Sequence, residues 1–394
     1  MKKALIILLI IAASLAVIVY GGVFLGHKVI FPMKRSNIPT IPALTDGRFT
    51  FGPQAHANQP RNMNDYIELL ARQIKIYNEI APDIWPDNAV VNQSAVVEDI
   101  SNNRFYHISI EGKITYISKN EALEYGINRL AYTGGFSFFN DPSSSAGMYL
   151  AVDSNELTNY LMWQKYLHLG TYDTIITLTH EGFHTLEQKK WKKPESVLNG
   201  GRNEFSENIP ARAKRLLLQT QLLKAVSQPG NTTLILEALS TYADWKRQFP
   251  DDYLNSVFFD RIEGTAYYYE LVTSLYIGYP DQIKNENDID LALALLATRG
   301  DIYLRYGLAS ESYTVGGFSS VLLERLNINW KEQVMNDPGA TPIEMLLQYY
   351  RDKTLPEPEQ VTQDVTDKVI IGLNTTPVNR GMTLFFKFLY DLLF

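Results

Sequence analysis

The stretch TIITLTHEGFHTLEQ, residues 174–188, says more about fold and chemistry than any other part of the chain. Its apolar residues recur at helical spacing and no proline interrupts it, so we predict a helix here. His180 and His184 form the pattern H-E-x-x-H, and positions i and i+4 of a helix lie on one face. Two imidazoles on one face can bind a single metal ion, and Glu181 between them can act as a general base. The alternative is a helix whose two histidines are only hydrogen-bonded in a core.

The absence of cysteine narrows the kind of metal site. Disulfides and thiolate zinc ligands are both excluded, and a zinc site of histidine and carboxylate is typical of catalysis. We therefore expect Zn²⁺ as the cofactor, held by three protein ligands. No histidine follows His184, and the earlier ones are His27, His56, His107 and His168. A carboxylate further along the chain is the expected third ligand.

Glu263 is the preferred third ligand, in a segment from Arg261 to Glu270 that has a helical pattern. Two small residues near it, Gly264 and Ala266, would let this second helix approach the motif helix closely. Glu270 shares a helical face with Glu263 and could orient a ligating histidine. The alternatives for the third ligand are Glu204 and Glu207.

Taken together, these residues resemble the gluzincin class of zinc metallopeptidases, which carry H-E-x-x-H on one helix and a glutamate on a following helix. The aromatic residue inside the motif and the E-G-x-A segment that begins at Glu263 are similar to uncharacterised bacterial zincin-like proteins. The resemblance covers roughly residues 81–325. One position departs from it, because many gluzincins carry Asp four residues after the third ligand and this chain has Tyr267.

The resemblance implies a zinc-dependent hydrolase, a metallopeptidase acting on a peptide or protein substrate. His180, His184 and Glu263 would bind the zinc, and Glu181 would act as general base on a zinc-bound water. A donor to the oxyanion is also needed. Tyr313 is the first choice, and Tyr267, Tyr268 and Tyr269 are alternatives.

A function of another class is also open, namely a non-catalytic, membrane-anchored zinc-binding or interaction protein on a zincin-like scaffold. The presence of Glu181 argues against it, because a structural site needs no base. Arg212, Arg215 and Arg247 could bind a substrate carboxylate, but solvated helix faces are the expected place for them. With a net charge of −7 and no dense Lys/Arg stripe, nothing favours nucleic acid as a partner, and we expect none.

The expected fold class is α+β and predominantly α-helical, with a zincin-like metal helix, a following ligand helix and a small β-hairpin region upstream. Alternating residues over Arg104–Ile110 and Lys113–Ser118 predict the hairpin. Helical periodicity covers Asn64–Ile80 upstream of it. Further helices are predicted over Arg212–Val226, Thr233–Gln248, Phe258–Tyr276, Ile289–Leu304, Val315–Leu326 and Glu344–Lys353.

The N-terminal residues 1–26 predict a transmembrane signal-anchor. An uncharged stretch from Ala4 to Gly26 would span about 34 Å as a helix, enough for a bilayer core of about 30 Å. A cleaved signal peptide is the alternative, with a site near Ser14-Leu15-Ala16. The anchor predicts a single-pass membrane protein whose body is extracytoplasmic, either periplasmic or extracellular.

The remaining domain limits follow from composition. Residues 27–62 are rich in proline and predict a linker, and residues 63–353 would form the zincin-like catalytic domain. Residues 354–394 would be a tail that is loose over Leu355–Pro377 and ends in an apolar segment, Met382–Phe394, too short to span a membrane.

Overall fold

The computed structural model describes residues 43–52, 60, 62–86, 92–127, 135–141, 144, 146–156, 168–171, 173–192 and 208–373. These residues belong to one unit, which extends from Ile41 to Leu373. It is mixed α+β and mostly helical, which confirms the predicted fold class at that level.

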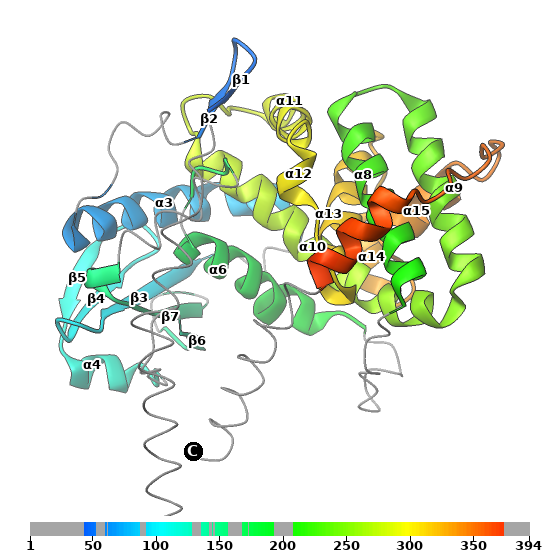
Figure 1. Cartoon of the computed structure of the whole chain (residues 1–394). Coiled ribbons are helices and arrows are strands. Elements are labelled where there is room, and N and C mark those ends of the chain that lie inside the picture. The colour runs from blue at the N-terminus through cyan, green and yellow to red at the C-terminus, as the bar shows by residue number, and fades with distance from the viewer. Residues whose placement is uncertain are drawn as a thin grey trace, which may run out of the picture. The chain divides into compact units, whose positions relative to one another are not determined.

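A five-stranded sheet forms the smaller part of the fold (Figure 1). Its order is β5-β4-β3-β7-β6, and every neighbouring pair is antiparallel except β3 and β7, which are parallel. The predicted hairpin is confirmed as β4 and β5. The strands are β3 (Gln93–Asp99), β4 (Arg104–Ile108), β5 (Ile114–Ile117), β6 (Phe136–Phe139) and β7 (Ala146–Val152). A separate hairpin consists of β1 (Leu44–Thr45) and β2 (Thr50–Phe51).

Helices cover both faces of the sheet. On one face, helix α3 (Met63–Ile84) contacts β3, β4 and β5, and helix α6 (Asp173–Gly182) contacts β7. On the other face, helix α4 (Lys119–Glu124) contacts β4. Because side chains alternate along a strand, Ala95 of β3 joins the main core while Val96 joins a smaller core behind the sheet.

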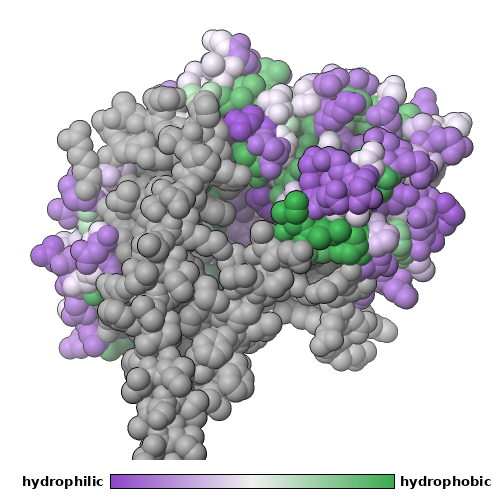
Figure 2. Space-filling model, in the orientation of Figure 1, coloured by the Kyte–Doolittle hydropathy of each residue, from purple (hydrophilic) through white to green (hydrophobic). Residues whose placement is uncertain are grey.

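The larger, helical part of the fold is centred on α10, which contacts α3, α6, α9, α11, α13 and α15. Hydrophilic residues cover much of the outer surface over α8 and α9 in the view of Figure 2. The helices are α8 (Ile209–Ser227), α9 (Thr232–Gln248), α10 (Pro250–Gly278), α11 (Glu286–Ala297), α12 (Gly300–Tyr303), α13 (Leu308–Arg325), α14 (Lys331–Asn336) and α15 (Pro342–Tyr349).

The backbones of α10 and α13 meet at two glycines. A Cβ atom on Gly264 would lie 2.4 Å from the Cα of Gly316, and one on Gly316 would lie 2.2 Å from the carbonyl oxygen of Asp260. Real Cβ atoms do not approach other atoms this closely, so this crossing requires glycine. Gly264 therefore serves the contact with α13 rather than the predicted contact with the motif helix.

Arg212 and Arg215 of α8 are buried in ion pairs, whereas the sequence analysis expected them on solvated helix faces. Arg215 donates to both carboxylate oxygens of Asp260, at 2.9 and 2.5 Å, and Arg212 pairs with Asp252 and Glu311. Both arginines are almost fully buried. Buried charges are tolerated when paired, so these contacts lock α8 against α10 and α13.

The chain after α15 also packs on the helical part, so the prediction of a loose tail is wrong for the residues described there. Residues 363–373 are helical, and Val369 is buried beside Ala213 and Leu216 of α8. Ser240 of α9 donates a hydrogen bond to the carbonyl oxygen of Pro356.

The membrane predictions need correction. No helix in the described part of the chain is both long and apolar enough to cross a bilayer. Even α10, which has the length, carries charged residues such as Asp260, Arg261 and Glu270. This finding contradicts the prediction of a single-pass, membrane-anchored protein with an extracytoplasmic body. The signal-anchor placed at residues 1–26 and the apolar end of the tail lie outside the described residues.

Replacing Gly316 by alanine tests the α10–α13 contact. We expect Gly316→Ala to lower the free energy of unfolding by about 1–3 kcal/mol, because the added methyl group forces the two backbones apart. The matched control is Gly300→Ala, whose Cβ would lie 3.7 Å from Leu223, an ordinary contact. That variant should change stability by less than about 1 kcal/mol in the same urea titration. Equal stabilities of the two variants would contradict a close backbone contact.

Candidate metal centre

The motif helix changes its winding inside the motif. It is α-helical over Asp173–Gly182, then forms a π-helical turn over Phe183–Glu187 and a 3₁₀ turn over Gln188–Lys190. The predicted helix is therefore helical throughout, but its second half is not α-helical. Gly182 lies against the sheet, where a Cβ would come within 2.8 Å of the Gln93 amide oxygen. Single π turns are rare in proteins, and those that do occur often lie at functional sites.

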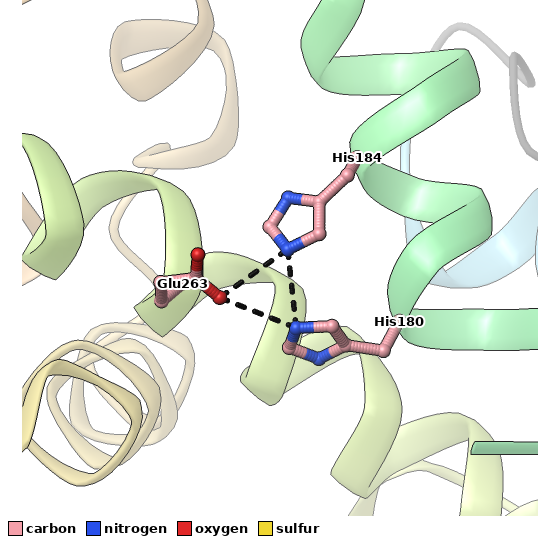
Figure 3. Close-up of side chains that lie close together, drawn as sticks. All are labelled: His180, His184 and Glu263. Carbon is pink, nitrogen blue, oxygen red and sulfur yellow. Dashed lines mark hydrogen bonds and ion pairs between the residues drawn. The ribbon is translucent and has the colours of Figure 1, made fainter. Parts of the chain in front are cut away.

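The structure brings His180, His184 and Glu263 together, with Glu263 reaching across from α10 (Figure 3). The Nε2 atoms of the two histidines are 3.1 Å apart. Each Nε2 atom lies 3.3 Å from Oε2 of Glu263. Three ligand atoms on two elements therefore face one point, as a metal site requires.

These spacings fit a zinc ion. Bonds of about 2.0–2.1 Å with tetrahedral angles place neighbouring ligand atoms about 3.3–3.4 Å apart. Two imidazole nitrogens and one carboxylate oxygen also form a donor set that suits zinc better than magnesium or calcium, which prefer oxygen alone. Glu204 and Glu207, the other ligands considered, lie outside the described residues.

His180 is held by Glu270 of α10. Its Nδ1 atom lies 3.0 Å from Oε2 of Glu270, which leaves Nε2 facing Glu263. Burial lowers the pKa of His180, but the hydrogen bonds and charges of Glu263 and Glu270 outweigh this and raise it to about 10 in the metal-free protein. Burial likewise raises the pKa of Glu263, and the two histidines hold it well below its usual value. The surroundings therefore favour positive charge at the point where the ligands meet.

His184 is held by Gln188, a residue the sequence analysis did not single out. The Nδ1 atom of His184 donates to the side-chain oxygen of Gln188. The amide nitrogen of Gln188 in turn donates to the carbonyl oxygen of Ile262, at 2.7 Å, and to Thr265, at 2.9 Å, both on α10. Gln188 thus connects the second histidine to the helix that carries Glu263. Its spacing of four from His184 was the only available sequence signal.

Tyr313 of α13 lies beside the three ligands. Its ring stacks on His180, with centroids 5.1 Å apart and planes 4° apart. Burial raises its pKa, and the charge and hydrogen bond of Glu263 and the charges of Glu270 and Glu181 raise it further. Tyr313 is therefore a protonated donor near neutral pH. Glu181, the predicted general base, is half-buried and lies next to His180 on the motif helix.

The three tyrosines considered as alternative oxyanion donors, Tyr267, Tyr268 and Tyr269, are buried in the core. Tyr267 packs against Tyr313 with centroids 5.5 Å apart, and its buried hydroxyl has no hydrogen-bond partner in the described part of the chain. Tyr268 packs edge-on against Trp330, and Tyr269 stacks on Phe183. These contacts favour a packing role for all three.

The remaining histidines do not join the centre. His107 of β4 lies 2.8 Å from Asp141, in the sheet, and the His168 side chain packs against Gly52. His27 and His56 lie outside the described residues. Within the described residues, His180, His184 and Glu263 form the one group of such side chains that could hold a metal ion.

Comparison of the chain with models of protein families, with curated proteins and with solved structures found no match. The resemblance to the gluzincins therefore stays a prediction, and the function must be argued from the geometry of the centre.

The raised pKa of His180 predicts how the stability of the metal-free protein depends on pH. A group whose pKa is raised from 6.5 to about 10 by folding stabilises the protein fully below about pH 6.5, and this contribution is lost as the pH rises towards 10. The free energy of unfolding should fall over this range by at most about 1.4 kcal/mol per pH unit for this one proton. Urea titrations after chelation measure it, and His180→Ala should flatten the slope. A slope unchanged in that variant would contradict the assignment.

The contact of Gln188 with His184 predicts an effect on metal affinity. Gln188→Met keeps the bulk of the side chain but removes the acceptor for His184, so zinc affinity should fall by about 10–100-fold. Competition with a fluorescent zinc chelator measures the change. The neighbouring exposed Lys189→Met is the control and should bind zinc as the unmodified protein does. Equal affinities of the two variants would count against the role of Gln188.

Proposed function

We propose that this protein is a zinc-dependent hydrolase, and that its substrates are peptides or proteins cleaved at an amide bond. The observation that carries the proposal is the convergence of His180, His184 and Glu263 at zinc-like spacings, with Glu181 next to the first ligand. A metal site needs only the three ligands. Glu181, adjacent to His180 in the sequence, and Tyr313, whose ring stacks on His180, would supply the base and the donor that hydrolysis needs in addition.

The two histidines and Glu263 would hold the ion. When bound there, zinc would polarise a carbonyl group and lower the pKa of a water molecule. Glu270 and Gln188 would keep both Nε2 lone pairs directed at it by accepting from the Nδ1 atoms. The preformed spacing supports this assignment, because little rearrangement would be needed on binding.

Glu181 would take a proton from the attacking water and pass it to the leaving amine. Tyr313 would donate its hydroxyl proton in a hydrogen bond to the oxyanion that forms on the substrate carbonyl. Its raised pKa keeps that proton in place at neutral pH, and its stacking on His180 fixes the ring. The role of Glu181 is supported by its carboxylate next to His180 in the sequence, and that of Tyr313 by its hydroxyl and the stacking of its ring on His180.

Two substitutions separate binding of zinc from catalysis. In the full chain loaded with zinc, Glu181→Gln should keep the metal and lower the turnover of a fluorogenic peptide mixture by about 10²–10⁴-fold. Tyr313→Phe should also keep the metal and lower turnover by about 10²–10³-fold. The matched controls are Glu124→Gln on α4 and Tyr349→Phe on α15, both exposed, which should leave turnover unchanged.

Zinc content is measured by mass spectrometry beside the turnover assay, and the two results together distinguish the possible explanations. One zinc per chain with no turnover of any peptide would favour the non-catalytic zinc-binding alternative. Retained turnover in Glu181→Gln would exclude the proposed mechanism. Zinc content that His180→Ala leaves unchanged would exclude the site itself.

A further inference from the structure

A pocket of about 590 Å³ lies on the face of α10 that is opposite the candidate metal centre. Its wall contains Tyr268, Val272 and Tyr276, which follow Glu263 by five, nine and thirteen residues. At about 100° per residue these positions lie on the far side of the helix from Glu263. None of the candidate metal ligands lines it, so the pocket is a second, separate feature.

The size and lining of the pocket suit a small organic ligand. Ligand pockets commonly enclose about 300–1,000 Å³ and combine an apolar wall with a few polar groups. Here the apolar part includes Val272 and Leu293, and two tyrosine rings add aromatic surface. Charged residues from α3, α11, α13, α14 and the segment before α11 surround it. The charged lining residues are Asp83, Lys284, Glu286, Asp290, Glu324, Arg325 and Lys331.

Most of these charged side chains already form ion pairs or hydrogen bonds within the protein. Arg325 pairs with Asp290 and donates to the carbonyl oxygen of Val226, and Lys331 pairs with Glu324 at 2.7 Å. Lys284 donates its amine to a backbone carbonyl.

Two carboxylates remain for a ligand. Asp83, near the end of α3, and Glu286, in the first turn of α11, are both exposed. Within the described residues, neither forms a hydrogen bond or an ion pair. Lys284 offsets one of the two negative charges, so the unpaired charge of the pocket is negative.

The pocket wall has the properties that attract a cation. Burial raises the pKa of Tyr276, and the nearby carboxylates Glu286, Asp288 and Asp83 raise it further, so Asp83 and Glu286 act on the same hydroxyl. The protein's own ammonium group on Lys331 lies 5.6 Å from the ring of Tyr268. Cations bind over aromatic faces at such distances.

We propose that this pocket binds an organic cation, an alkyl ammonium or guanidinium group held between Asp83 and Glu286, with its apolar stem against Tyr276 and Val272. A free polyamine and a basic side chain of a polypeptide both carry this chemistry. The pocket is on the opposite face of α10 from the metal centre, so binding does not depend on the proposed hydrolase activity.

Calorimetry on the full chain, after chelation of metal, tests the proposal with two probes. Spermidine represents a free polyamine, and N-acetyl-Gly-Lys-Gly-amide represents a basic side chain. Replacing both carboxylates, Asp83→Asn with Glu286→Gln, should weaken binding by about tenfold or more, because charge-assisted hydrogen bonds are lost. Tyr276→Leu keeps apolar volume, removes the ring of this half-buried residue and should weaken binding by about two- to fivefold.

The matched control carries the same change of net charge elsewhere. Asp301→Asn with Asp352→Asn replaces two exposed carboxylates outside the pocket, and this variant should bind as the unmodified protein does. Binding of one probe alone identifies the source of the cation, and binding of both supports the shared chemistry. No binding of either probe, or equal losses in the pocket and control variants, would overturn the proposal. Melting curves of all variants, recorded beside the titrations, would check that each is folded.

Discussion

The buried ion pair between Arg215 of α8 and Asp260 of α10 is the interaction on which the rest of the helical part depends. The same carboxylate accepts a hydrogen bond from Ser312 of α13 at 2.6 Å, so one group connects three helices. Glu263 follows Asp260 by one turn on α10, and Tyr313 follows Ser312 directly on α13. A shift of either helix by a turn would leave buried charges unpaired, which costs several kcal/mol. The contact therefore fixes the relative positions of Glu263 and Tyr313, the proposed metal ligand and hydroxyl donor, which are distant in sequence.

α10 also fixes the two histidines, although neither lies on it. Glu270 accepts from His180 directly, and Gln188 transmits the position of α10 to His184 through hydrogen bonds with Ile262 and Thr265. All three ligand atoms thus depend on one rigid helix. A site held in this way is preorganised, because the conformational entropy of its side chains is already lost on folding.

Much of the helical framework and the three converging side chains could be predicted, because periodicity and motif spacing are local properties of the sequence. The ion pair of Arg215 with Asp260 could not be predicted from the sequence, because the two residues are 45 positions apart and an arginine on a helix usually faces water. β3 was missed because its sequence, Gln93–Asp99, mixes polar and apolar residues that are all buried, and its parallel partner β7 is far along the chain. Gln188 was missed because glutamine is common on helices and only its tertiary contacts distinguish it.

The departure from the gluzincin pattern at Tyr267 does not leave His180 without a carboxylate partner. A carboxylate four residues after Glu263 would occupy that position, but Tyr267 packs there against Tyr313 of α13. Glu270, two turns after Glu263, returns to the same helical face and accepts the hydrogen bond from His180. Any carboxylate that reaches the Nδ1 atom of His180 can orient its ring, and a residue four or seven positions after Glu263 lies on the helix face from which this is possible. The orientation of His180 is therefore better judged from the helix face than from the spacing in the motif.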